Sequence, residues 1–282
     1  MPLLSAFLDS EAFALRASSL PCHNGRVCGR FSLFSDDEDL VSLFHIDLVV
    51  GEHTPSWNVA PSHPIRVILD RMVSQPVQDP AATGASLSGQ PPRQSHNGER
   101  LDTPLIRQRQ MRLVEWGLVP EWAKPPFRPM INARSETLVE KPSFRVATSR
   151  RRCLVPANGY FEWQQSDAGA KQPWFLSGGD DDPVLAFAGI IEMRKDLENH
   201  WWPTCAIVTR SASDALGQIH ERTPLVMSPH VWDAWLDPAL ADSAQIRGLL
   251  DAVPVPALTP RRVSRAVGSV KNNGPDLIRT ID

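Results

Sequence analysis

The chain has 282 residues, which is enough for one large domain or two small ones and for a sizeable buried core. No stretch approaches the roughly 18 uninterrupted apolar residues of a membrane-spanning helix. The net charge of −3 argues against a nucleic-acid partner, yet residues 105–155 hold 11 Lys or Arg and 4 Asp or Glu. A codon bias would explain an excess of Arg but not its clustering, and a basic stripe is what a phosphate-tracking groove needs.

The N-terminal half predicts a leader, a helix, a strand and an insertion. Residues 1–27 have no clear periodicity and lack a secretory signal, so we interpret them as a loose leader. Ser35 and Glu38 are placed as a capping box for a helix with one apolar face, formed by Leu40, Val41, Leu43, Phe44 and Leu48. Residues 65–69 predict a strand. In 74–104, 16 of 31 residues are Pro, Gly, Ser or Gln, which predicts a disordered insertion.

The C-terminal half alternates strands with turns and short helices. Strand-like runs occupy 111–116, 153–163, 173–177, 184–191 and 204–209. Ser228-Pro229 predicts a helix start that carries Val231, Trp232 and Trp235, and a last helix is predicted at about 242–252. There is no βαβ rhythm and no glycine fingerprint for a nucleotide. The pattern therefore predicts an α+β fold with a curved, mainly antiparallel β-sheet and peripheral helices.

The four cysteines, Cys22, Cys28, Cys153 and Cys205, form no CxxC pair. This predicts a reducing compartment with free thiols. Cys153 and Cys205 lie in apolar strands and are interpreted as structural. No Cys or His has a metal-ligand spacing, so no metal or other cofactor is expected.

Four short islands carry the residues that could do chemistry: Val27–Phe31, Trp116–Trp122 with Asn132–Thr137, Arg152–Trp163 and Ile219–Leu225. Taken singly, a Cys or His in them is as well explained by packing as by catalysis. Glu162 follows the single Tyr and lies between Phe161 and Trp163. A carboxylate shielded from water there would have a raised pKa and serve as a proton donor, whereas a salt bridge to Arg is the alternative.

Taken together, the islands resemble the SOS response-associated peptidase (SRAP) family, whose members process abasic sites in DNA. The resemblance runs from Cys28 to about Leu277, broken by the insertion, and includes Cys-Gly-Arg-Phe, Asn-Ala-Arg-x-Glu and Ile-His-x-Arg-x-Pro. The tail, Val263-Ser264 and Val270-Lys271-Asn272, looks like the family's ending with slight departures. Thr223 stands where the family pattern has Met. The resemblance implies a curved sheet in the form of an open barrel, as one domain over 28–282.

The resemblance implies a covalent trap built on an N-terminal cysteine. The α-amine and thiol of Cys28 would capture the aldehyde of an abasic site in single-stranded DNA as an imine and then a thiazolidine, which is lyase-type chemistry. Glu162 would protonate the ring oxygen as the sugar opens, and His220 would shuttle protons or hold the departing oxygens. Asn132 would hold the cysteine terminus and the sugar.

The DNA contacts are also carried over by position. Arg30 and Arg134 would hold backbone phosphates. Trp116 and Leu118 would stack on or wedge against bases, with plain core packing as the alternative.

Cys28 is internal in this sequence, and an amide nitrogen cannot form an imine. The preferred hypothesis is that translation starts at Val27, because GTG is a bacterial start codon, and that removal of the initiator Met leaves Cys28 free. The alternative is proteolytic release of residues 1–27, with Cys28 itself as a candidate nucleophile. A bacterial cytoplasmic protein, monomeric and bound to the nucleoid through DNA, is expected.

Two other function classes remain open. Cys28, His220 and either Glu162 or Asn132 would suit a thiol peptidase, with His220 as the base. A non-covalent single-stranded DNA binder with a vestigial site is the third class.

Overall fold

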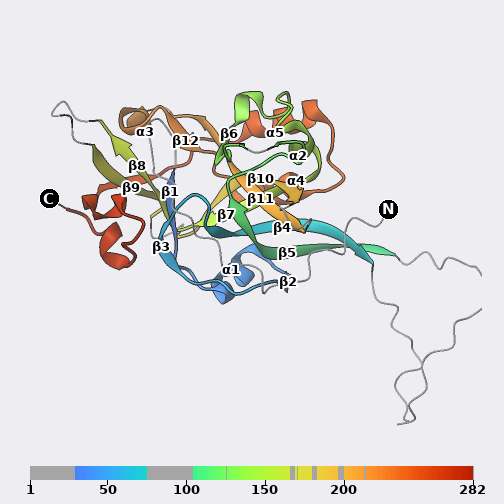
Figure 1. Ribbon diagram of the computed structural model, residues 1–282, viewed down its shortest axis with the longest axis horizontal. Coiled ribbons are helices and arrows are strands. Elements are labelled where there is room, and N and C mark those ends of the chain that lie inside the picture. Colours follow the sequence, from blue (N-terminus) through green and yellow to red (C-terminus); the bar gives the residue numbers. More distant parts are fainter. Residues whose placement is uncertain are drawn as a thin grey trace, which may run out of the picture.

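A computed structural model describes residues 29–74, 104–124, 126–165, 169, 171–179, 183–195, 200–212 and 214–281 (Figure 1). The α-helices are α1 (Asp37–Phe44), α2 (Arg145–Arg150), α3 (Asp214–Ile219), α4 (Pro229–Leu236) and α5 (Ser243–Ala252). Short 3-10 helices occupy Ser135–Thr137, Arg265–Gly268 and Pro275–Ile278. The strands are β1 (Arg30–Leu33), β2 (Leu48–Val49), β3 (Ser56–Val59), β4 (Pro64–Ser74), β5 (Leu105–Trp116), β6 (Asn132–Arg134), β7 (Arg152–Ala157), β8 (Gly159–Gln164), β9 (Gln172–Ser177), β10 (Leu185–Lys195), β11 (Trp201–Ser211), β12 (Arg222–Pro224) and β13 (Thr259–Arg262).

Within this described part, the strands form two sheets, and the larger one curls until it closes. A five-stranded sheet has the order β13-β9-β8-β1-β3. An eight-stranded sheet has the order β12-β11-β10-β7-β4-β5-β2, with β6 on β11 and a further pairing of β11 with β5. That last pairing joins Thr204 to Glu115 in parallel, so β5, β4, β7, β10 and β11 form a ring. Most pairs are antiparallel, which confirms the predicted fold class.

One hydrophobic core joins the two sheets. The Phe31 ring of β1 lies edge-on to Trp116 of β5, with ring centroids 5.2 Å apart. Helix α4 closes one side of the ring of strands, because Trp235 donates from Nε1 to the Cys153 carbonyl at 2.8 Å. Burial of these large aromatic side chains contributes to the stability of this arrangement.

Cys153 and Cys205 face each other inside the ring. Their sulfur atoms are 3.9 Å apart and both side chains have no exposed surface. The strand between them carries Gly189, where a Cβ would lie 2.8 Å from the Cys153 sulfur. Both thiols are free, as predicted, and burial raises the pKa of Cys153.

The predicted first helix is present, but its cap differs from the prediction. The Asp36 carboxylate, rather than Ser35, accepts the hydrogen bond from the Asp39 amide at 2.9 Å. The Ser35 hydroxyl instead accepts from the Asn158 side chain at 2.8 Å. Asp and Ser are equally good N-cap residues. Because Asn158 engages the Ser35 hydroxyl, Asp36 caps the helix instead. Leu40 and Phe44 are buried as predicted, whereas Leu48 lies in β2.

The predicted single strand over 153–163 is two strands in different sheets. Strand β7 ends before Asn158, whose side-chain oxygen accepts a hydrogen bond from the Phe34 amide at 2.7 Å. Gly159 is required here because a Cβ would lie 2.4 Å from the Phe175 ring and 2.6 Å from the Leu176 carbonyl oxygen. The break sends β8, with Glu162, into the smaller sheet.

The other predicted elements are found with different lengths. Helix α4 begins after Ser228 with Pro229 at its first position, and α5 begins after Asp242. The strand predicted at 65–69 extends over the whole of β4. The leader 1–27 and most of the insertion lie outside the described residues. No helix in the described ranges is long and apolar enough to cross a membrane.

Candidate functional site

Glu162 lies on the inner face of β8. In this strand, Phe161 packs into a small apolar cluster with Phe175, Val263 and Val267, on the face opposite to Glu162. Glu162 therefore shares its face with Tyr160. Its exposed fraction is 3%, so the side chain is buried.

Two hydrogen bonds place the segment 218–223 opposite that face. The Tyr160 and Thr223 hydroxyls are 2.9 Å apart, and the Gln164 amide nitrogen donates to the Gln218 carbonyl at 3.1 Å. These contacts flank Glu162 on β8 and His220 on the facing segment. Figure 1 shows α3 and β12, the two elements that this segment joins, beside β8. The fold thus places the segment that carries His220 opposite the strand that carries Glu162.

The His220 ring is held in one tautomer. Its Nδ1 accepts a hydrogen bond from the Arg222 amide at 3.1 Å. The neutral ring therefore carries its proton on Nε2. Burial is the main reason that the pKa of His220 is lowered, and the cations Lys171 and Arg222 lower it further, against an opposing contribution from Glu221. His220 is consequently a neutral hydrogen-bond donor through Nε2 near pH 7.

Arg222 is fixed by a paired carboxylate. Its Nη1 and Nη2 contact the Glu136 oxygens at 2.5 and 2.9 Å, and Nη2 also donates to the Thr209 carbonyl at 2.8 Å. The hydrogen bonds from Arg222 hold the pKa of Glu136 at about 2, below its usual 4.5. Arg222 is 8% exposed, so its side chain is held inside the protein. The ion pair therefore has a structural role next to His220.

Asn132 and Arg134 lie across β11 from Arg222. Strand β6 runs parallel to β11, with Asn132 opposite Ile207 and Arg134 opposite Thr209. Strand β12 pairs on the other side of β11 through Arg222 and Ser211. Asn132 is half-buried, and Arg134 is exposed as a phosphate contact would require.

Arg30 is placed differently from the predicted phosphate contact. It is 3% exposed, and its guanidinium donates to the Val267 carbonyl at 2.8 Å and to the Asn58 side chain at 2.9 Å. Both partners belong to the protein interior, so we do not retain the phosphate role for Arg30.

Trp116 and Leu118 also differ from the predicted base contact. Each has no exposed surface, and the Trp116 indole donates to the Ile131 carbonyl at 2.9 Å. Core packing, the alternative given for both, describes their environment. An indole that is hydrogen-bonded and packed on Phe31 presents no face to a base.

The exposed aromatic residue of this region is Trp122, which sequence reasoning assigned to a motif but not to a contact. It is 62% exposed, and its ring meets Phe127 edge-on at 6.3 Å. Lys124 and Arg128 are exposed on the same loop. The sequence feature that could have indicated its exposure is that Trp122 lies in a Pro-rich, basic segment, where a large apolar side chain is unexpected.

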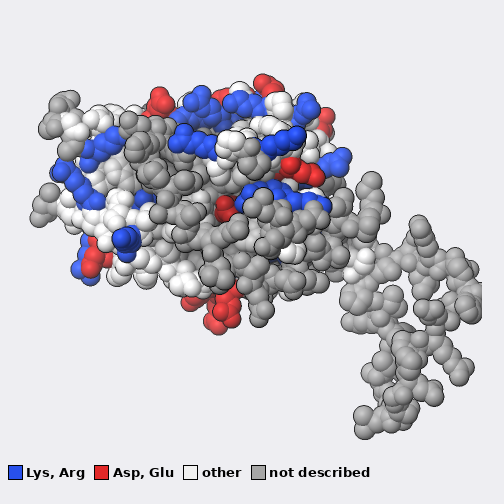
Figure 2. Space-filling model, viewed as in Figure 1, with Lys and Arg blue, Asp and Glu red and all other residues white. Residues whose placement is uncertain are grey.

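The basic stretch divides into structural and exposed cations. Arg107 and Arg109 contact Asp70, Arg151 contacts Glu192, and Arg152 donates to backbone carbonyls of α4 and α2. The exposed cations come from the loop after β5, from β6 and from the region of α2: Lys124, Arg128, Arg134, Lys141, Arg145 and Arg150. Figure 2 shows Lys and Arg gathered along the edge that carries β6 and α2, with some acidic side chains among them, and a further acidic group on the opposite edge near α1.

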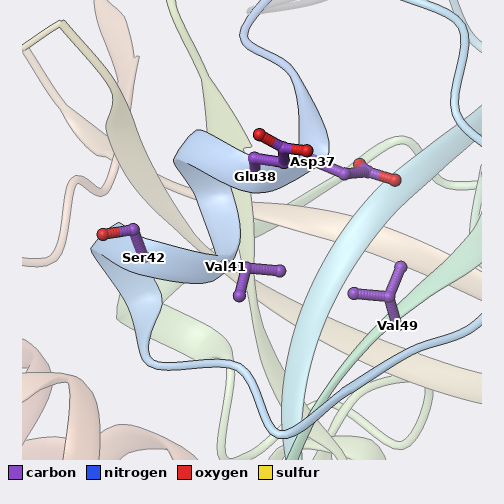
Figure 3. A pocket seen from close by; sticks show the side chains of 5 residues that line it. All are labelled: Asp37, Glu38, Val41, Ser42 and Val49. Carbon is purple, nitrogen blue, oxygen red and sulfur yellow. The ribbon is translucent and has the colours of Figure 1, made fainter.

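Cys28 lies outside the described residues. The strand that follows it starts at Arg30, which pairs with Phe161, the neighbour of Glu162. A separate groove between α1 and β2 lies elsewhere and is lined by Asp37, Glu38, Val41, Ser42 and Val49 (Figure 3). Asp37 there turns toward β4 and pairs with Arg66. Among the residues with described positions, no three His, Cys, Asp or Glu side chains are grouped as metal ligands.

Residues 27–270 match the family described as SOS response associated peptidase (SRAP). The chain belongs to this family. It is 33% identical over 258 residues to the Bacillus subtilis abasic site processing protein YoqW, covering 90% of this chain and all of that protein. It is 34% identical over 171 residues to the Escherichia coli abasic site processing protein YedK, covering 60% of this chain and 74% of that protein.

Solved structures share the SRAP-type fold. A phage-related protein from Bordetella bronchiseptica superposes with a TM-score of 0.56 at 26% identity, covering 84% of this chain and 95% of that one. A second protein from the same organism gives a TM-score of 0.61 at 20% identity, covering 84% of this chain and all of that one. The second likeness concerns the fold alone.

Proposed function

We propose that this SRAP protein, beginning at Cys28, captures abasic sites in single-stranded DNA as a covalent adduct. The observation that carries the proposal is that the segment with His220 lies opposite Glu162 on β8, and that β8 pairs with β1, the strand that follows Cys28. The names of the relatives support abasic sites as the target.

The chemistry needs an amine and a thiol on one residue. The Cys28 α-amine attacks the aldehyde carbon of the opened sugar, and loss of water from the resulting carbinolamine gives an imine. The thiol then adds to the imine carbon while the nitrogen takes a proton, which closes a five-membered thiazolidine. An α-amine has a pKa of about 7.7–8.0, so a useful fraction is unprotonated at neutral pH. Ring closure is intramolecular and correspondingly fast.

The side chains of the site supply the proton transfers and the orientation. Glu162, buried on the inner face of β8, protonates the ring oxygen as the sugar opens. His220 donates a hydrogen bond from Nε2 to the departing hydroxyl or a phosphate oxygen. Asn132 holds the cysteine terminus and the sugar, and Arg134 on the same short strand contacts a phosphate.

The strand of DNA follows the exposed basic edge near β6 and α2. Trp122 offers a stacking face that tolerates any base, and Lys124 and Arg128 flank it with positive charge. Single-stranded DNA suits this surface because its unpaired bases can stack on the Trp122 indole.

The tautomer of His220 favours the trap over a thiol peptidase. In a His-dependent peptidase, one ring nitrogen donates to an orienting group, and the other keeps a free lone pair that takes the proton of the nucleophile. Here Nδ1 accepts a hydrogen bond from the Arg222 amide, so the neutral ring has its proton on Nε2. A proton already on Nε2 leaves that atom unable to act as the base.

The test is a denaturing gel of protein begun at Cys28 with a single-stranded abasic oligonucleotide. We expect a shifted band that survives denaturant, absent with Cys28→Ala and with an undamaged oligonucleotide of the same sequence. Retention by Cys28→Ala under non-denaturing conditions alone, with no wild-type adduct, would favour the non-covalent binder.

The N-terminus needs its own measurement. The family match begins at residue 27, which supports Cys28 as the first residue of the working protein. We expect mass spectrometry of the native protein to give a chain that starts at Cys28. An active protein that still carries residues 1–27 would contradict the proposed chemistry.

A further inference from the structure

The C-terminal turn 264–273 is joined to the start of β1 by a buried guanidinium. Arg30 donates from Nη1 to the Val267 carbonyl at 2.8 Å and from Nη2 to the Gly268 carbonyl at 3.3 Å. Figure 1 shows the C-terminal segment, coloured red, beside β1 and β3. A cation that is 3% exposed depends on these carbonyls for its solvation.

Asn58 of β3 completes the joint. Its Oδ1 accepts from Arg30 at 2.9 Å, and its Nδ2 donates to the Ser269 carbonyl at 2.9 Å and the Asn272 carbonyl at 2.8 Å. Asn58 is 2% exposed. One amide therefore connects Arg30 to the far side of the turn, using its acceptor and its donors at once.

The turn is closed and docked independently of these two residues. Asn272 donates from its side chain to the Ala266 carbonyl at 2.7 Å, and the Asn273 side chain accepts from the Trp57 amide at 2.8 Å. Val267 packs in the apolar cluster that contains Phe161 of β8. The turn thus contacts β1, β3 and β8, the strands around Glu162, through separate contacts.

We propose that Arg30 and Asn58 are positioning residues for the capture reaction, and that the C-terminal turn acts through them. They fix the start of β1, two residues after Cys28, relative to Glu162 on the neighbouring strand. The reaction needs an amine placed against a sugar carbon, and small displacements of reacting groups cost large factors in rate. This inference rests on the proposed function and gives Arg30 a role that needs no contact with DNA.

Two conservative variants test the proposal in protein begun at Cys28. Arg30→Lys keeps the charge but loses the fork that spans two carbonyls. Asn58→Asp keeps the acceptor for Arg30 but loses every donated hydrogen bond to the turn. Asp276→Asn is the matched control, because Asp276 lies in the same tail and pairs only at the surface with Arg279, both side chains being more than 70% exposed.

Three quantities are measured for each protein: the capture rate constant at saturating abasic oligonucleotide, the Kd for an undamaged single strand at two salt concentrations, and the thermal midpoint. For Arg30→Lys and Asn58→Asp, we expect the rate constant to fall on the order of 10- to 100-fold, with the Kd and its salt dependence unchanged. The Asp276→Asn control should match the wild type in all three.

The contrary outcomes are distinct. Unchanged capture by both variants overturns the positioning role and leaves the proposed function intact. A weaker Kd for Arg30→Lys, at an unchanged rate constant, makes Arg30 a DNA contact instead. Loss of folding in both variants makes the joint purely structural and also overturns the proposal. A wild-type protein that forms no adduct refutes the proposed function itself.

Discussion

The Glu136 carboxylate and the Arg222 guanidinium form a fork-to-fork ion pair, with contacts of 2.5 and 2.9 Å. Glu136 follows β6, which carries Asn132 and Arg134, and Arg222 begins β12, two residues after His220. This pair therefore fixes the distance between the two segments that supply the polar side chains of the site. A bidentate contact of this kind is stronger and more directional than a single charge pair.

Glu136→Gln should lower stability at neutral pH and flatten its acid dependence. Arg222 holds the pKa of Glu136 at about 2, below its unfolded value of 4.5. Stability from this lowered pKa is present above pH 4.5 and is lost as the pH falls toward 2. Because the Glu136 side chain is 46% exposed, we expect only about 1 kcal/mol at pH 7.

Urea unfolding at pH 7 and pH 3 measures this effect. Glu140→Gln is the control, because Glu140 contacts Arg247 with a side chain that is 68% exposed. Equal losses in the two variants, or a loss that is the same at both pH values, would contradict the assignment.

His220→Gln should retain far more capture activity than His220→Ala. A glutamine amide nitrogen reaches the position of Nε2 and can donate the same hydrogen bond, whereas it cannot relay a proton. The Nδ1 contact with Arg222 and the lowered pKa of His220 both indicate a donor role. Capture rates at saturating DNA distinguish a hydrogen-bond donor from a proton shuttle. If the two variants are equally slow, His220 shuttles protons instead.

Glu162→Gln should slow capture of a natural abasic site by roughly 100-fold or more, since general acid catalysis contributes on that order. The same variant should capture an abasic analogue whose aldehyde cannot cyclise at nearly the wild-type rate, because that analogue has no ring oxygen to protonate. Parallel time courses on the two oligonucleotides provide the measurement. An equal defect on both would place Glu162 in a later step, such as the loss of water that forms the imine.

Trp122→Ala should weaken binding of undamaged single-stranded DNA by about 1–3 kcal/mol, the contribution of one stacked base. Trp122→Phe keeps an aromatic face and should recover most of the affinity. The capture rate at saturating DNA should be unchanged in both, since the indole lies on the basic loop rather than beside Glu162. Fluorescence anisotropy with a labelled oligonucleotide gives the affinities, and Ala and Phe variants that bind equally would exclude stacking.

Much of the secondary structure follows from local pattern. Helix α4 begins at Pro229, as Ser228-Pro229 predicts, although the Ser228 side chain makes no capping hydrogen bond, and α5 covers most of the predicted range 242–252. Local sequence pattern did not predict the element boundaries that depend on tertiary contacts. The run 153–163 reads as one strand because its apolar residues dominate, although Asn158-Gly159 within it is a turn signal, and the close approach of Phe175 to Gly159 shows where the break lies.

The sequence indicated which residues are candidates for the site, but it did not predict how they are arranged in space. Glu162 stood out in the sequence through its aromatic neighbours, whereas contacts of Tyr160 and Gln164 place it opposite the segment that carries His220. The hydroxyl of Thr223, at a position where the family pattern has Met, contacts the Tyr160 hydroxyl. Arg30 and Trp116 show the limit of motif reasoning, because both belong to motif islands and both are buried.

The two thiols enclosed by the ring of strands have a practical consequence. Cys153 and Cys205 offer no surface to an alkylating reagent, and the raised pKa of Cys153 keeps it in the unreactive protonated form. In a chain begun at Cys28, maleimide or iodoacetamide under native conditions should therefore modify a single residue. Fluorophores, affinity tags or chemical quenchers can then be attached at that residue alone, without first replacing the other cysteines.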